Sequence, residues 1–401
     1  DLSIEAAGSL DIQASVAGES VSLRGDAGVA VHETVASSTT LFIDSAAGDV
    51  AINAAITGND RIELGADQGL LTTSVALSSD EISLHGGDVM VDAALSIAAD
   101  RASGDITLVA KTGNLQVNDA VNATGTVTAT ADAGQVITNA TLKANDIAIA
   151  AATGVTVLES ITADDSLDIT TTSGDVMISG QLLGFNTLLV RAATGMTTIT
   201  QQTTGGEATI EGGAGVLVQE DFLASNSLTA SSSAGDVTIN ARFESGGDAT
   251  LSSAQGEVNT ANVVSGESVT ISAGGDINLA GDVNSNSAIA ITTDTGSVSS
   301  VGEIAGATDV SIIASQGDIQ VASVEGLQSV VMTAAGSLTG SGELKGESTG
   351  ISLDAGTTID LSGLVTGSDV AIIAGQGITL AGAESTTGNV DITGSTISAD
   401  G

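Results

Sequence analysis

The stretch that decides the fold runs from Gly235 to Gln255 and reads GDVTINARFESGGDATLSSAQ. Its apolar residues form two alternating pairs with one further apolar position between them: Val237, Ile239, Phe243, Ala249 and Leu251. Alternation with polar residues is typical of short strands that bury one face and expose the other. The stretch therefore predicts three short strands joined by corners.

The same unit recurs along the whole chain, with nearly all steps between 19 and 22 residues and a Gly shortly before each first strand. The predicted first core residues of the successive units are Leu10, Val29, Val50, Leu71, Val89, Leu115, Val136, Val155, Val176, Met196, Val216, Val237, Val258, Ile277, Val298, Ile319, Leu338, Thr358 and Ile378. A second core position is expected six residues after each of these, and the rule fails at Gln202 and Glu325. The Gly residues are expected to supply backbone freedom at the corners.

A unit of about twenty residues with three strands and three corners predicts one coil of a triangular parallel β-solenoid. A helical repeat fits less well, because Gly recurs at every turn and the apolar period is two. We expect residues 1–401 to form a single continuous β-solenoid that is a segment of a longer rod. The longest step, from Val89 to Leu115, predicts a small corner insertion near residues 96–105, either a tolerated surface loop or a binding loop.

Stability should be collective, because one coil buries too few aliphatic side chains to offset its loss of conformational entropy. The core is then a set of columns that run from coil to coil. Phe222 and Phe243 hold equivalent positions in neighbouring units, so they are predicted to stack directly.

The composition excludes several classes of partner. The chain has 8 Lys and Arg against 49 Asp and Glu, for a formal charge of −41. Such a surface repels nucleic-acid phosphates and anionic lipid. The sequence has no Cys, which excludes disulfides and thiolate metal sites, and it has no apolar stretch long enough for a membrane span.

Several segments resemble the repeats of filamentous-haemagglutinin-type exoproteins, which are secreted by a two-partner route. They are GGDINL at 274–279, GDVAINA at 48–54, SLDI at 166–169 and GDV at 174–176. The likeness covers essentially the whole chain but rests on a degenerate repeat. It implies a right-handed parallel β-helix, secretion to the bacterial surface (often through an outer-membrane partner) and a role as an adhesin shaft or effector stalk.

We therefore expect a non-enzymatic, extracellular structural and adhesive rod of a large bacterial surface protein. Its expected partner is a receptor or matrix on a host or neighbouring cell, and end-to-end self-association is an alternative. A self-assembling filament or sheath subunit is the competing function. A carbohydrate-active β-helix is the enzymatic alternative, but it would need long corner loops with clustered carboxylates and basic residues. No cofactor is expected to be required.

Few residues suggest a site. His32 and His85 are the only histidines and are expected to be solvated corner residues. Arg24, Gly25 and Asp26 form an integrin-type tripeptide directly after the core residue Leu23, where a corner would expose it to a receptor.

An ice-binding surface would need a ladder of Thr-x-Thr pairs in register. Pairs such as Thr126/Thr128 and Thr198/Thr200 occur, but the sequence does not repeat them from unit to unit.

One acidic ladder suggests a metal. Asp236, Glu257 and Asp276 stand directly before the first core residue of three successive units. Stacked coils place such neighbours roughly 5 Å apart, where like charges repel. Calcium, which prefers oxygen ligands, would relieve that repulsion. The competing interpretation is a solvated acidic stripe whose side chains splay apart.

Overall fold

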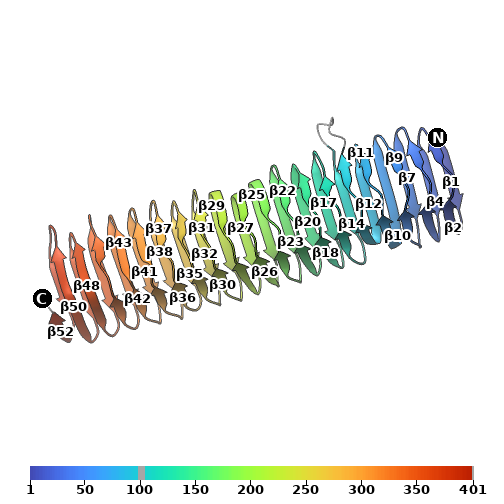
Figure 1. Ribbon diagram of the computed structural model, residues 1–401. Coiled ribbons are helices and arrows are strands. Elements are labelled where there is room, and N and C mark those ends of the chain that lie inside the picture. Colours follow the sequence, from blue (N-terminus) through green and yellow to red (C-terminus); the bar gives the residue numbers. More distant parts are fainter. Residues whose placement is uncertain (98–103, 400–401) are drawn as a thin grey trace. The chain divides into compact units, whose positions relative to one another are not determined.

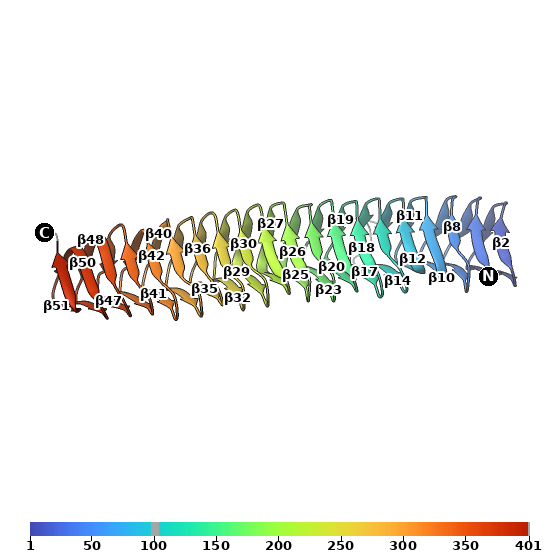
Figure 2. The ribbon, with the colours of Figure 1, turned by 90° about the horizontal axis from the view of Figure 1, so that it is seen from below.

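The computed structural model describes residues 1–97 and 104–399, and these residues form strands and turns without any helix. The chain divides into two compact units, residues 1–205 and 206–401, with the boundary inside β27 (Thr203–Gly212). Each unit is a parallel β-solenoid of about 20 residues per coil with three strands in each coil. Figures 1 and 2 show the stacked strands, with unit 1 in blue to green and unit 2 in yellow-green to red. The predicted fold class is confirmed.

Unit 1 contains three columns of parallel strands. The first column, which follows the Gly corners, contains β2 (Ser9–Ile12), β5 (Gly28–Val31), β8 (Val50–Ile52), β15 (Leu115–Val117), β18 (Gln135–Thr138), β21 (Gly154–Val157), β24 (Val176–Ile178) and β26 (Met196–Ile199). The second contains β3 (Val16–Gly18), β6 (Val35–Ser37), β9 (Ile56–Gly58), β11 (Leu77–Ser79), β13 (Leu95–Ile97), β16 (Val121–Asn122), β19 (Leu142–Ala144) and β22 (Ile161–Ala163). The third contains β1 (Leu2–Ala6), β4 (Val21–Gly25), β7 (Thr40–Ser45), β14 (Ile106–Ala110), β17 (Thr126–Ala131), β20 (Asp146–Ala151) and β23 (Ser166–Thr171). Three longer strands turn a corner and serve two columns: β10 (Arg61–Thr73), β12 (Ile82–Val91) and β25 (Leu182–Ala192).

Unit 2 repeats this arrangement. Its first column contains β28 (Gly215–Val218), β30 (Val237–Ile239), β33 (Val258–Thr260), β36 (Ile277–Leu279), β39 (Val298–Ser300), β42 (Ile319–Val321), β45 (Leu338–Gly340) and β52 (Thr396–Ala399). The second contains β31 (Phe243–Ser245), β34 (Val264–Gly266), β37 (Val283–Ser285), β40 (Glu303–Gly306), β43 (Ser323–Gly326) and β46 (Leu344–Gly346). The third contains β32 (Ala249–Ser253), β35 (Val269–Ala273), β38 (Ile289–Thr293), β41 (Asp309–Ala314), β44 (Ser329–Ala334), β47 (Gly350–Ala355), β49 (Val370–Ala374) and β51 (Val390–Thr393). The strands that serve two columns are β29 (Phe222–Ser232), β48 (Ile359–Gly367) and β50 (Gly377–Ser385).

The core of each unit consists of inward side chains that stack in register. In unit 2 the first column pairs Val216, Val237, Val258, Ile277, Val298, Ile319, Leu338, Ile359 and Ile378 in succession. All of these side chains are buried. Because the apolar area comes from the stack and not from a single coil, each coil depends on its neighbours for its core.

Two predicted core positions are wrong by one residue. The residue paired with Val176 is Thr197, not Met196, and the residue paired with Leu338 is Ile359, not Thr358. Both predicted residues, Met196 and Thr358, stand one or two positions after a Gly. The strand's period of two instead places Thr197 inward together with Ile199, and Ile359 inward together with Leu361.

The one-residue correction of the first core positions also changes the second column. It removes the exception expected at Gln202, and it replaces Leu364 as a second-column core residue. Six positions after Thr197 comes Thr203, which is fully buried, so the six-residue rule does not fail at this coil. Val365, and not the partly exposed Leu364, pairs with Leu344. The exception near Glu325 is real, because Val324 occupies the inward position five residues after Ile319.

Glycine is needed at these corners mainly because it lets the backbones of neighbouring coils approach each other closely. A Cβ atom on Gly235 would lie 1.7 Å from the carbonyl oxygen of Ala214 in the neighbouring coil, a distance that no side chain tolerates. Left-handed backbone is the reason at fewer positions, such as Gly28 with φ of 141°. The expected role in backbone freedom is therefore only part of the explanation.

Phe222 and Phe243 pack against each other as predicted. They are paired in register, both are fully buried, and their ring centroids are 5.9 Å apart at an interplanar angle of 72°. The rings meet edge to face, which is a favourable arrangement for two aromatic quadrupoles.

The predicted insertion near 96–105 falls largely on residues 98–103, which lie outside the described residues. Its two flanks lie side by side, because a Cβ atom on Gly104 would be 2.4 Å from Cγ2 of Ile97.

Candidate functional site

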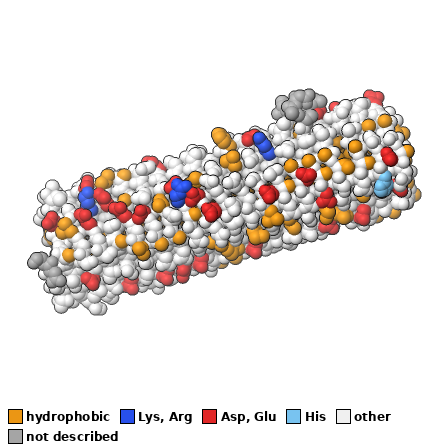
Figure 3. Space-filling model, viewed as in Figure 1, with side chains coloured by type: hydrophobic (Ala, Val, Ile, Leu, Met, Phe, Trp, Pro, Cys, Tyr) orange, Lys and Arg blue, Asp and Glu red, His pale blue; other side chains and the backbone are white. Residues whose placement is uncertain are grey.

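Acidic side chains at the corners bind the backbone of the next coil. In both units an Asp oxygen accepts a hydrogen bond from a backbone N–H 19 to 26 residues later, at 2.6 to 2.9 Å. We call these residues the corner carboxylates: Asp49, Asp88, Asp105, Asp175, Asp236, Asp276, Asp282 and Asp318. In Figure 3 Asp and Glu side chains are spread along the visible face, whereas Lys and Arg occupy few places. Some of the acidic side chains therefore link neighbouring coils by hydrogen bonds, a role that was not predicted from the sequence.

The predicted calcium ladder lies among these contacts. An oxygen of Asp236 accepts the backbone N–H of Glu257, and an oxygen of Asp276 accepts that of Ser297. Glu257 accepts a side-chain bond from Asn259 at 3.3 Å. Each acid thus already has an N–H donor that offsets some of its negative charge, and calcium binding here stays a prediction.

The predicted receptor tripeptide straddles the end of β4. Arg24 and Asp26 are exposed, and the corner turn begins at Asp26, as expected. Gly25 is buried, and the Arg24 guanidinium donates two hydrogen bonds to Asp44, at 3.1 and 3.2 Å. The same guanidinium lies 5.8 Å from the centre of the Phe42 ring. A receptor role for the tripeptide stays a prediction, and Arg24 already has an intramolecular partner.

Arg24 belongs to a set of charged side chains that five successive coils of unit 1 bring to one corner. We call this set the corner cluster: Arg24, Asp44, Asp67, His85 and Lys111. Strand register places Arg24 beside Asp44, Asp44 beside Gly65, and Gly65 beside His85. Asp67 follows two residues after Gly65 in β10, and Lys111 follows directly after β14.

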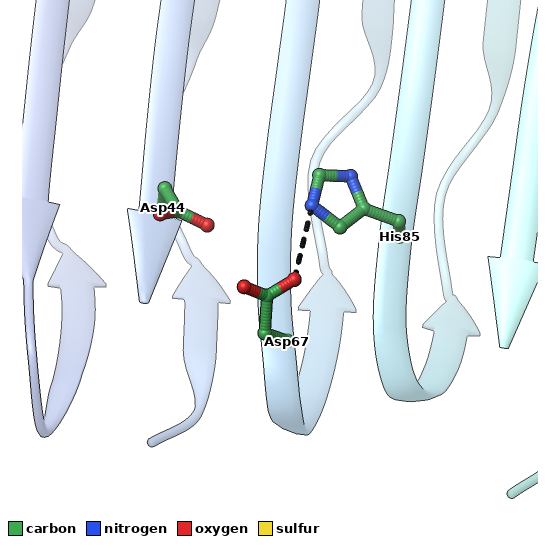
Figure 4. Close-up of side chains that lie close together, drawn as sticks. All are labelled: Asp44, Asp67 and His85. Carbon is green, nitrogen blue, oxygen red and sulfur yellow. Dashed lines mark ion pairs between the residues drawn. The ribbon is translucent and has the colours of Figure 1, made fainter. Parts of the chain in front are cut away.

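Distances within the corner cluster show two ion pairs and a nearby imidazole. Lys111 Nζ lies 2.6 Å from Asp67 Oδ1, and Arg24 Nη2 lies 3.1 Å from Asp44 Oδ2. His85 Nε2 lies 3.7 Å from Asp67 Oδ1, as the dashed line in Figure 4 marks. The side chain of Asp44 is only 7% exposed and that of His85 21%.

The hydrogen bond from the Lys111 ammonium lowers the pKa of Asp67. Burial acts in the opposite direction, while the charges of Lys111 and Arg24 add to the lowering. Asp67 therefore remains an anion at neutral pH.

The sequence analysis missed this cluster. His85 was expected to be a solvated corner residue, but it lies within β12 and its side chain is largely buried. Three basic side chains gather here around two carboxylates. The register is the information that was missing, because residues from 24 to 111 become neighbours only when coils stack. His32 does fit the expectation, with 44% of its side chain exposed and Asp11 3.6 Å away.

Hydroxyl side chains also form a register-dependent surface in unit 2. The outward positions of β29, β32, β35 and β38 carry Thr229, Ser231, Thr250, Ser252, Thr270, Ser272 and Thr292, which we call the hydroxyl face. Strand pairing aligns Thr229 with Thr250 and Thr270. It also aligns the remaining residues in one row, which contains Ser231, Ser252, Ser272 and Thr292. A trough of about 240 Å³ runs along Ser252, Ser272 and Thr292. The ladder is Thr-x-Ser, so a pattern of Thr-x-Thr pairs does not detect it.

Comparisons with protein-family models, with curated proteins and with solved structures found no match. Within residues 1–97 and 104–399 there is no helix of the length and apolarity that crossing a membrane requires.

Proposed function

We propose that this chain is a non-enzymatic structural and adhesive shaft of a large extracellular protein on a bacterial surface. The observation that carries the proposal is the uniform stacking within each unit. The inward columns continue in register from coil to coil, and the corner carboxylates bind the coil that follows. Such a stack provides length and stiffness through many equivalent contacts.

The resemblance of the repeats to filamentous-haemagglutinin-type exoproteins supports the bacterial surface as the location. The hydroxyl face supports the adhesive part of the proposal, because it presents polar groups at the regular spacing of the coils. A receptor or matrix with its own regular polar surface is the partner that this pattern would suit.

Removal of one coil tests the shaft role. Deleting residues 237–257 joins Asp236 to Val258, which occupies the position of Val237 in the next coil. We expect the shortened chain to fold, to reach the surface of the producing bacterium, and to lose roughly 4.8 Å of length. Far-UV circular dichroism, protease accessibility on intact cells and adhesion of those cells are the measurements.

The matched control removes residues 237–247, which is about half a coil. This deletion places a third-column strand where a first-column strand belongs, so we expect it to disrupt the stack and prevent surface display. The proposal fails if the full-coil deletion unfolds like the half-coil deletion. It also fails if the parent protein stays inside the cell.

A further inference from the structure

The corner cluster contains a gap at Gly65. In the column that passes from Arg24 through Asp44 to His85, Gly65 is the position without a side chain. The imidazole of His85 leans across this position. A Cβ atom on residue 65 would lie 2.4 Å from His85 Nε2 and 2.7 Å from Asp44 Oδ1. The absence of a side chain at Gly65 is therefore what lets an imidazole nitrogen and a buried carboxylate oxygen face each other.

Three potential ligand atoms converge on this gap. One oxygen each from Asp44 and Asp67 and a nitrogen of His85 lie within 4.8 Å of one another, the one such group among the residues that the structure describes. A tetrahedral metal with bonds of about 2.0–2.1 Å separates its ligand atoms by roughly 3.3 Å. The 3.7 Å between His85 Nε2 and Asp67 Oδ1 is too long for a hydrogen bond and close to that separation.

The ligand types indicate which metal would bind. An imidazole with two carboxylates suits a divalent transition metal such as Zn²⁺, whereas calcium and magnesium prefer oxygen ligands alone. We propose that Asp44, Asp67 and His85 form a binding site for a divalent transition metal of the Zn²⁺ class. The site would join three coils of unit 1, and it does not depend on the proposed shaft function.

The two cations of the cluster compete with the metal to different degrees. Arg24 bonds to Oδ2 of Asp44 and leaves Oδ1 facing Gly65. Lys111 occupies Oδ1 of Asp67, the same oxygen that faces His85. The Lys111 side chain is 42% exposed and can swing into solvent. Removing the Lys111 ammonium should therefore strengthen metal binding. If the cluster were only an ion-pair contact, removing Lys111 would disrupt the cluster and would not strengthen metal binding.

Calorimetric titration of the whole chain with Zn²⁺ tests the site, with Co²⁺ absorption as a report of imidazole ligation. We expect one site that His85→Asn weakens by more than roughly tenfold. Gly65→Ala should weaken it similarly, although every ligand remains, because the new methyl displaces the imidazole. Lys111→Ala should bind Zn²⁺ more tightly than the parent. His32→Asn is the matched control, since His32 has one acidic neighbour at 3.6 Å, and it should bind like the parent.

Thermal unfolding separates metal binding from loss of fold. Zn²⁺ should raise the melting temperature of the parent and of His32→Asn, but not that of His85→Asn or Gly65→Ala. The inference is overturned if Zn²⁺ does not bind, or if it binds all these variants equally through the acidic surface. It is also overturned if Lys111→Ala weakens binding, because the cluster would then be an ion-pair contact only.

Discussion

Replacing Phe243 by alanine should destabilise unit 2 more than the loss of an aliphatic side chain from the same column. Phe243 is fully buried, and its ring packs edge to face on Phe222 at 5.9 Å. Truncating a buried Phe costs about 3–5 kcal/mol. About 0.5–1.5 kcal/mol more belongs to the aromatic pair itself. Leu344→Ala, in the same column without an aromatic neighbour, is the control and should cost about 2–5 kcal/mol.

A double-mutant cycle with Phe222→Ala isolates the ring contact, and the coupling should be about 0.5–1.5 kcal/mol. Guanidinium unfolding followed by far-UV circular dichroism gives the free energies. Hydrogen exchange over residues 222–245 locates the effect, because stacked repeats can unfold in parts. A cost for Phe243→Ala within about 0.5 kcal/mol, as for a surface substitution, would refute the assignment of this column to the core.

Thr73→Val should raise the free energy of unfolding by about 1 kcal/mol or more, since the fully buried hydroxyl of Thr73 has no hydrogen-bond partner; a lower denaturation midpoint would contradict this. The Ser166 hydroxyl lowers the pKa of Asp146 below 3.8, so this contact stabilises the fold above that pH and is lost as pH falls through the folded value. Asp146→Asn should therefore flatten the acid limb of a stability–pH curve, and an unchanged limb would exclude the contact as a contributor. If the predicted acidic ladder binds calcium, then calcium should raise the melting temperature of the parent more than that of Glu257→Gln; equal shifts would leave a solvated stripe.

The core columns could be predicted from the sequence because their signal is local. Val237 and Ile239 alternate within one short strand, and the pattern returns after each Gly corner. Predictions failed where polarity and orientation disagree. Met196 is apolar but partly exposed, while Thr197 is polar and fully buried. A strand orients its side chains by its period of two, and a single buried Thr costs too little to change that register.

The corner carboxylates were visible in the sequence only as charge. In the sequence Asp236 stands directly before a predicted strand. Its role as a hydrogen-bond acceptor depends on the backbone N–H of Glu257, which lies one coil away. From the sequence these acids are expected to repel one another. The structure shows that the N–H groups of the following coil offset part of that repulsion, because each coil stacks directly on the previous one.

The sequence by itself determined the repeat, the three strands of each coil and the inward columns, because all of these follow from apolar spacing within about twenty residues. Tertiary structure alone decided the corner cluster and the hydroxyl face. Asp44, Asp67 and His85 meet over Gly65 only because the corners between them set the register of three coils. Corner length varies by a residue or more from coil to coil, and one residue of slip would turn each of these side chains to another face.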